Sequence, residues 1–231
     1  MSTNTIDAIE INPEVTATAS IIWMHGLGAA GDDFLPLPEQ LNLPKKHSIR
    51  FIFPNAPIKP ITINNGLQMR AWYDIKCFNS LCFNPNDPEN HEGIIESQRI
   101  INNLINREIE QNILATRIIL TGFSQGGAMA LHTGLRFNQS LGGIICLSGY
   151  LPWMDLLIDQ RSLANQNTHI FMSHGLFDPI IPFHLAKQSC DFLKSLNYNI
   201  NWHNYPMQHT IIEKEIIDIG NFVKKTLGYK S

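Results

Sequence analysis

The chain alternates short apolar blocks with longer stretches in which apolar residues recur every three or four positions. The blocks cover residues 20–24, 49–53, 117–122, 142–148, 168–174 and 199–205. Most of them are continuous apolar runs, which is typical of strands that are buried on both faces. The pattern therefore predicts a mostly parallel sheet with helices packed on either side.

Amphipathic helices are expected between these blocks. Residues 92–113 place Ile94, Ile101 and Leu104 at roughly helical spacing, with charged residues at the other positions. Similar patterns occur at residues 124–137, 184–196 and 211–227. This order of strands and helices predicts an α/β fold, organised as a single domain over residues 1–231.

Two segments depart from the alternation. Residues 6–20 have the pattern of an antiparallel strand at the start of the sheet. Residues 61–91 form a long, irregular stretch, and loops of that length are usually functional or disordered.

Composition and charge narrow the classes of partner. Seventeen Lys and Arg against twenty Asp and Glu give a net charge of −3, so nucleic acid is not an expected partner. The N-terminus lacks the features of a secretory signal, and no apolar run is long enough to span a bilayer, which predicts a cytoplasmic protein. Reduced thiols are expected because zinc-type spacing is missing from Cys77, Cys82, Cys146 and Cys190.

The segment TGFSQGG at residues 121–127 follows a predicted strand, precedes a predicted helix and matches the pattern G-x-S-x-G around Ser124. Its glycines permit a tight turn from which the serine oxygen projects, and a helix N-terminus presents free N–H groups to nearby negative charge. The alternative is a glycine-rich turn that only packs a helix onto the sheet. A serine nucleophile also needs a base and an acid. Whether the chain supplies both therefore decides between a nucleophile and a purely structural turn.

The acid is expected after the serine in the chain, in a loop at the carboxyl edge of the sheet. Asp178 stands just beyond the predicted strand at residues 168–174, in a segment closed by prolines. Asp155 and Asp159 lie in a more amphipathic segment, and Asp191 falls inside a predicted helix. Asp178 is therefore the preferred acid.

The base is expected to be a histidine that follows the acid. His209 lies in a loop between the last predicted strand and the last predicted helix, whereas His184 opens a helix and His203 lies within a strand-like segment. His25 and His174 precede glycines at strand ends, are expected to shape loops by hydrogen bonding and remain reserve candidates. Loop placement favours His209, and activity is expected to fall in acid as this base takes up a proton.

An acyl-transfer site also needs donors for the tetrahedral oxyanion. The segment HGLGAAG at residues 25–31 forms a second glycine-rich turn after a predicted strand. The backbone N–H groups of Leu27 and of Gln125, the residue after the serine, are the candidate donors. The alternative for the first turn is that its glycines only let the chain bend sharply.

Seven motifs occur together in one order: HGLG at His25, FPNAP, RAWYDI, GFSQGGAMAL, LSGYLP, HGLFDPIIP and HT at His209. On these motifs the chain resembles the small carboxylesterase and acyl-protein thioesterase family, the phospholipase/carboxylesterase group of α/β-hydrolases, over nearly its whole length. The resemblance implies an α/β-hydrolase fold and a cofactor-free serine hydrolase acting on esters or thioesters. Ala29 and Gln208 depart from the family pattern, which commonly has an acidic residue and a glycine there.

The resemblance also bears on substrate contacts. Trp72 lies where the family carries an aromatic residue near the mouth of the site, and structural packing is an equally good interpretation. Residues 74–93 are expected to form a lid-like loop in which Phe78, Leu81 and Phe83 either cover an acyl chain or pack into the core. Residues Arg70 and Asp74 are a candidate local ion pair.

Three functions follow from this sequence. The first is an ester or thioester hydrolase with Ser124, His209 and Asp178 as catalytic triad, and the second is a lysophospholipase with the same triad. The third is a catalytically silent scaffold that binds lipid or protein. No metal site is expected, because the chain has no HExxH or comparable ligand cluster. The physiological substrate, transient membrane contact and the oligomeric state stay open at this point.

Overall fold

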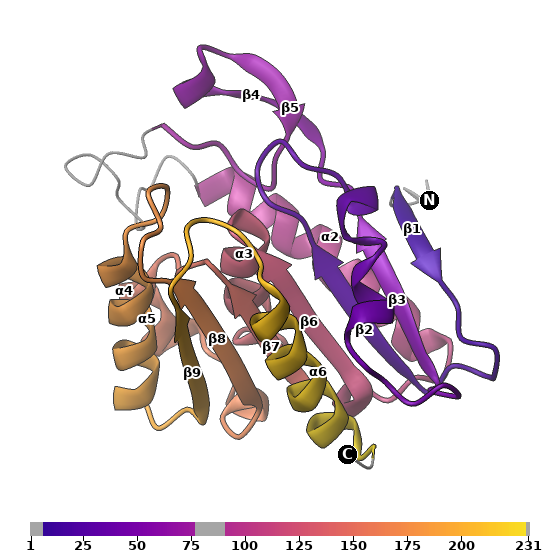
Figure 1. Ribbon diagram of the computed structural model, residues 1–231. Coiled ribbons are helices and arrows are strands. Elements are labelled where there is room, and N and C mark those ends of the chain that lie inside the picture. The colour runs from indigo at the N-terminus through magenta and orange to yellow at the C-terminus, as the bar shows by residue number, and fades with distance from the viewer. Residues whose placement is uncertain (1–6, 77–90, 230–231) are drawn as a thin grey trace.

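The computed structural model describes residues 7–76 and 91–229. Its centre is a seven-stranded sheet in the order β1-β3-β2-β6-β7-β8-β9 (Figure 1). The strands of this sheet are β1 (Ala8–Ile11), β2 (Ala19–Met24), β3 (Ile49–Pro54), β6 (Ile118–Phe123), β7 (Gly143–Leu147), β8 (His169–Gly175) and β9 (Ile200–Tyr205).

The central strands pair in parallel and bury their apolar runs completely. All six residues of β2 are buried, and Ile21 and Ile22 stand beside Ile119 and Leu120 of β6. Strand β1 pairs antiparallel with β3, so the antiparallel opening expected for residues 6–20 is confirmed. Continuous apolar runs were therefore the right indicator of strands covered on both faces.

Helices cover both faces of the sheet (Figure 1). They are α1 (Leu37–Gln40), α2 (His91–Glu110), α3 (Gln125–Gly134), α4 (Met154–Gln160), α5 (Phe183–Ser195) and α6 (Glu213–Leu227). Side chains of α2, α3, α4 and α5 belong to one hydrophobic core, and those of α6 belong to a second core on the other face. The mostly parallel sheet and its flanking helices confirm the predicted fold class.

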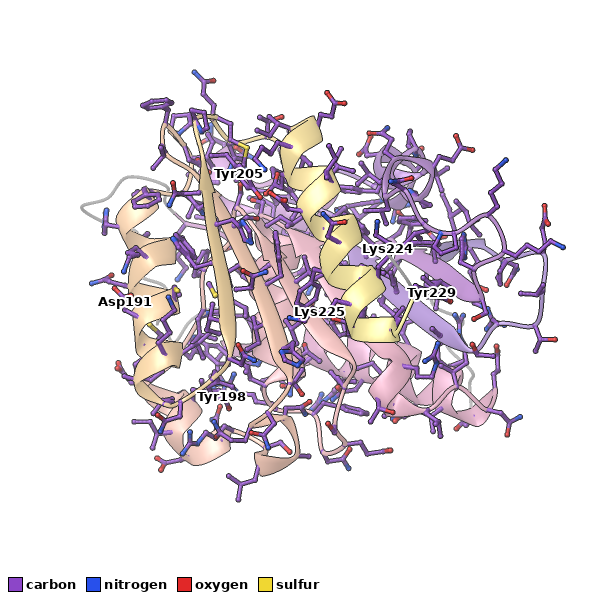
Figure 2. All side chains as sticks on the ribbon, turned by 60° about the horizontal axis from the view of Figure 1, so that its bottom comes forward. Asp191, Tyr198, Tyr205, Lys224, Lys225 and Tyr229 are labelled. Atoms are coloured by element: carbon purple, nitrogen blue, oxygen red, sulfur yellow. The ribbon has the colours of Figure 1, made fainter. Side chains whose placement is uncertain are left out.

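Helix α6 spans the sheet from the carboxyl edge of the parallel strands toward the opposite edge. Figure 2 shows Tyr205, at the end of β9, near the start of this helix, and Lys224, Lys225 and Tyr229 at its far end. The hydroxyl of Tyr205 donates to Asp218 at 2.9 Å, which fixes the first turns of α6 to the strand end. The loop that precedes α6 is thereby held over the carboxyl edge.

The stretch expected to be irregular, residues 61–91, contains regular structure. Strands β4 (Ile58–Ile61) and β5 (Leu67–Arg70) form a separate antiparallel hairpin, closed by a 3-10 turn and by left-handed Asn65 and Gly66. The paired asparagines and the glycine were the turn signal that the sequence offered. Of the lid-like loop expected at residues 74–93, residues 77–90 lie outside the described residues, and the last three belong to α2.

Parallel strands bring their carboxyl ends to one edge of the sheet. Three of these ends matter for function: β2 leads into the segment at His25, β6 ends next to Ser124, and β8 ends three residues before Asp178. Because β2 neighbours β6 and β8 lies two places from β6, these segments meet above the middle of the sheet.

Candidate active site

Ser124 occupies the turn between β6 and α3 in a strained backbone conformation. Its φ is 56° and its ψ is −119°, which lies outside the regions that an L-residue ordinarily adopts. The turn is held by the amide of Ser124, which donates to the carbonyl of Leu147 at 2.8 Å, and by its carbonyl, which accepts from Ala128 at 3.0 Å. The serine side chain therefore stands at the carboxyl edge on a rigid support.

The crowded glycines around Ser124 are explained by close approach of the main chain. A Cβ atom on Gly122 would lie 2.1 Å from the carbonyl carbon of Gly126, and one on Gly126 would lie 2.3 Å from the carbonyl oxygen of Met24. Both distances are far inside van der Waals contact. The start of α3 thus rests directly on the ends of β6 and β2, where only glycine fits.

The three residues chosen for the triad lie in one hydrogen-bonded line. His209 Nδ1 is 2.7 Å from Asp178 Oδ2, and His209 Nε2 is 2.9 Å from Ser124 Oγ. An ionised carboxylate only accepts hydrogen bonds, so Nδ1 carries the proton and the neutral ring presents Nε2 as an acceptor to the serine hydroxyl. This is the tautomer that a general base needs.

The carboxylate of Asp178 is buried and ordered by backbone donors. Its side chain has no exposed surface, and its Oδ1 accepts from the amides of Ile180 at 2.8 Å and Ile181 at 2.9 Å. Burial raises the pKa of this carboxyl, but the hydrogen bond and charge of His209 and the two amides lower it more, so the net pKa lies below the usual value. The group is therefore an anion at neutral pH.

His174 supports the same carboxylate from the other side. Its Nε2 donates to the carbonyl of Ile181 at 2.8 Å and lies 3.3 Å from Asp178 Oδ2. Burial lowers the pKa of His174, so the ring is neutral near pH 7. The sequence indicated a loop-shaping role for His174. The structure shows that His174 also contacts Asp178. The spacing of four residues between them was the sequence signal for this contact.

The other acidic and histidine candidates lie away from this line. Asp155 and Asp159 belong to α4, and Asp191 pairs with Lys187 on the exposed face of α5. His184 is exposed in the first turn of α5, and the ring of His203 in β9 stacks on Phe171 at 4.7 Å. None of these side chains is a hydrogen-bond partner of Ser124 among the described residues.

His25 serves the turn that follows β2. Its Nδ1 donates to the carbonyl of Gly26 at 2.7 Å, and its Nε2 accepts from the amide of Ala56 at 2.9 Å. Burial lowers its pKa, which keeps the ring neutral and compatible with both bonds. The expected loop-shaping role of His25 fits these contacts.

The two candidate oxyanion donors stand on either side of the serine turn. Leu27 lies in the segment after β2, and Gln125 is the first residue of α3. Within residues 7–76 and 91–229, neither backbone N–H donates to a protein acceptor. A side chain at Gly26 would lie 3.3 Å from Ser124 Cβ, so the Leu27 turn and the serine are in contact.

The side chain of Gln125 ties this region to a third segment. Its Oε1 accepts from the amide of Trp72 at 2.8 Å, and its Nε2 donates to the carbonyl of Tyr73 at 2.7 Å. The indole of Trp72 donates to the carbonyl of His25 at 2.9 Å. The sequence analysis did not predict that the Gln125 side chain connects these segments. The signal in the sequence was an amide side chain directly after the nucleophile.

For Trp72, the sequence left substrate contact and structural packing equally open. Its side chain is fully buried and supports the His25 turn, which fits the packing interpretation. The expected ion pair of Arg70 and Asp74 needs correction. Arg70 and Asp74 do not pair with each other: Arg70 bonds Asp7 at 3.2 Å, and Asp74 accepts from the amide of Thr62 at 2.8 Å. The other expected substrate contacts, Phe78, Leu81 and Phe83, lie outside the described residues.

Metal-ligand clusters and membrane-spanning helices are absent from the described parts of the chain. Residues 7–76 and 91–229 contain no group of three His, Cys, Asp or Glu side chains placed to hold a metal ion. None of the helices found there has the length and apolar character needed to cross a bilayer. Cys146 and Cys190 are free and buried, as expected for reduced thiols, and burial raises the pKa of the Cys146 thiol to about 12.

Comparison with known proteins places this geometry in a family. The family model described as Phospholipase/Carboxylesterase matches residues 5–227. Acyl-protein thioesterase 1 of Yarrowia lipolytica is 38% identical over 224 residues, which cover 95% of this chain and 97% of the relative.

Solved structures agree with this match. The crystal structure of Arabidopsis thaliana SOBER1 aligns with a TM-score of 0.83 at 30% identity, covering 90% of this chain and 99% of that one. Zea mays acyl-protein thioesterase 2 aligns with a TM-score of 0.81 at 25% identity, covering 96% and 99%. The chain therefore belongs to the phospholipase/carboxylesterase family of α/β-hydrolases.

Proposed function

We propose that this protein hydrolyses carboxylic esters or thioesters through an acyl-enzyme on Ser124. The observation that carries the proposal is the position of His209, whose two ring nitrogens lie 2.9 Å from Ser124 Oγ and 2.7 Å from Asp178 Oδ2. A histidine held in this way can take a proton from the serine hydroxyl and return it later in the reaction. The site needs no cofactor for this chemistry.

In the first half of the reaction, Nε2 of His209 accepts the hydroxyl proton while Ser124 Oγ attacks the carbonyl carbon. The carbonyl oxygen becomes an oxyanion that the backbone N–H groups of Leu27 and Gln125 stabilise. Loss of one such donor typically costs ~10²–10³ in rate. The intermediate then collapses: the bond from carbon to the leaving sulfur or oxygen breaks, and Nε2 gives its proton to that atom.

In the second half, water replaces the leaving group. His209 removes a proton from the water, the hydroxide attacks the acyl carbon, and Ser124 leaves with the proton from Nε2. Throughout, the Asp178 carboxylate accepts from Nδ1 and stabilises the imidazolium. Its lowered pKa keeps it ionised while the ring is charged.

The relatives support one substrate class over the others. The Yarrowia lipolytica protein that is 38% identical over nearly all of this chain is named an acyl-protein thioesterase. We therefore propose that the leaving atom is the sulfur of an acylated cysteine in a protein or peptide. Small carboxylic esters and lysophospholipids are the competing substrates, since they share the acyl half and the same machinery.

Covalent labelling tests the nucleophile. The protein is treated with a fluorophosphonate probe and the labelled peptide is mapped. We expect the label on Ser124, no label in Ser124→Ala, and full labelling in the control Ser195→Ala, which alters an exposed serine at the end of α5. Labelling of Ser124→Ala at the wild-type rate would refute this assignment.

A matched substrate panel tests the class. Thioester, oxyester and lysophospholipid substrates with the same acyl chain are compared by kcat/KM. The proposal predicts the highest value for an S-acylated cysteine peptide. A lysophospholipid that exceeds it at the same chain length would make lysophospholipase the better description of the same triad.

A further inference from the structure

A small hollow opens beside His209. It has a volume of about 290 Å³ and lies between the segment of Asp33 and Phe34 and the loop at His209. Its walls are mainly apolar and are formed by Phe34, Leu37, Phe123 and Ile211. Phe123 also packs on the imidazole, with ring centroids 4.8 Å apart, so the hollow continues directly from the base.

The chemistry of the site determines which part of a substrate enters this hollow. During acyl transfer the carbonyl oxygen points toward the N–H groups of Leu27 and Gln125, and the leaving atom must receive its proton from His209 Nε2. A hollow bordered by His209 itself and by the next two residues, Thr210 and Ile211, is therefore on the leaving-group side. We call it the leaving-group groove.

The two segments that border the leaving-group groove carry charges of one sign. Residues 29–41 and 206–213 contain the acidic residues Asp32, Asp33, Glu39 and Glu213 and no Lys or Arg. All four are exposed. The first cation after residues 206–213 is Lys214, which pairs with Asp218 on α6 at 3.3 Å.

The exposed acids at the groove itself stand on the 3-10 turn at residues 31–34. Asp33 lines the groove and accepts from the amide of Ala30 at 2.9 Å through Oδ2, which fixes the direction of its carboxylate. Asp32 precedes it in the same turn. An apolar floor beneath an acidic rim fits a leaving group that combines an apolar side chain with a cation.

We propose that the leaving-group groove binds the residues that flank the acylated cysteine in a peptide or protein, and selects an apolar residue next to a Lys or Arg. This inference rests on the proposed function and deepens it, since it concerns the leaving-group half of the substrate, which is the cysteine and its neighbours. Exposed ion pairs are weak, so the selection is expected to be modest.

The experiment uses S-acylated peptides with one acyl chain and three flanking sequences. The first has Phe and Lys beside the cysteine, the second has Phe and Glu, and the third has only Gly and Ser. The wild-type protein is expected to favour the Lys peptide over the Glu peptide by roughly five- to tenfold in kcat/KM, with the preference reduced in 0.5 M salt. The Gly and Ser peptide should fall between them.

Two variants locate the effect. Asp33→Asn keeps an oxygen acceptor for the amide of Ala30 and should lower the ratio of Lys to Glu peptide rates by about threefold. Asp32→Asn should also lower this ratio, and it leaves intact the one hydrogen bond that Asp32 contributes to the turn, which its main-chain carbonyl accepts from the amide of Leu35. The control Asp191→Asn, on the outer face of α5, should leave the ratio unchanged (Figure 2).

The outcomes separate this inference from the function on which it rests. Equal rates on all three peptides would overturn the groove assignment and leave the hydrolase intact. A preference for Lys that neither aspartate variant changes would also overturn it. Failure to hydrolyse every peptide, while the fluorophosphonate still labels Ser124, would overturn both the groove assignment and the proposed substrate class.

Discussion

Replacing Glu215 by Gln should remove a specific pH dependence of stability. Glu215 lies in the first turn of α6, its side chain is fully buried, and its Oε1 accepts from the hydroxyl of Ser173 on β8 at 2.5 Å. Burial raises the pKa of this carboxyl from 4.5 to about 7, and the Ser173 hydrogen bond opposes that rise only in part.

The sign and size of the effect follow from these values. Below pH 4.5 the carboxyl of Glu215 is protonated in both the folded and the unfolded chain. Between pH 4.5 and about 7 the unfolded chain releases this proton while the folded one keeps it, so stability falls as the pH rises. A tenfold change in an ionisation constant corresponds to ~1.36 kcal/mol, which gives a total loss of about 3 kcal/mol.

Urea unfolding at pH 5, 6, 7 and 8 measures this loss. The free energy of unfolding of Glu215→Gln minus that of the wild type should become more positive by about 2.5 kcal/mol between pH 5 and pH 8, since the rest of the loss falls below pH 5. The other titrating groups cancel in this difference. Glu213→Gln changes an exposed carboxylate in the same helical turn and should show no such trend. Parallel curves for Glu215→Gln and the wild type would refute the reasoning.

Two further predictions concern the catalytic line and its support. Asp178→Asn should lower kcat by about 10⁴-fold, because an amide donor facing His209 favours the wrong tautomer; steady-state kinetics measures this, and an effect no larger than that of Asp191→Asn would contradict it. Gly126→Ala should destabilise the protein by at least about 3 kcal/mol, because its Cβ would lie 2.3 Å from the Met24 carbonyl oxygen. Denaturant unfolding checks the second prediction, and an unchanged midpoint would disprove it.

The main elements of the fold were predictable from apolar patterning. Residues 20–24 and 117–122 are apolar without alternation, and such runs become the buried, parallel β2 and β6. The amphipathic repeat at residues 92–113 becomes α2. These elements were predictable because burial on both faces gives a continuous apolar run, and burial on one face gives a periodic repeat.

The candidate triad was predictable in part for a different reason. Order along the chain and loop placement selected Ser124, Asp178 and His209, and the structure brings them within hydrogen-bond distance. Each follows a predicted strand, so the edge of the sheet on which it stands was already determined.

Contacts between distant segments leave no comparable pattern in the sequence. Trp72 donates its main-chain amide to the side-chain Oε1 of Gln125 and its indole N–H to the main-chain carbonyl of His25, and no local sequence pattern marks either partner. The leaving-group groove requires Phe34 and Ile211 to line the same hollow, which no local pattern encodes. The hairpin of β4 and β5 was short enough to be read as loop.

The bridge from Gln125 to Trp72 also bears on how the protein folds. It joins residues 53 positions apart, so it forms only after a long stretch of chain has been ordered. A partly folded molecule can hold the serine turn on β6 and α3 and still lack this brace. We therefore expect activity to recover later than helical signal when the protein refolds.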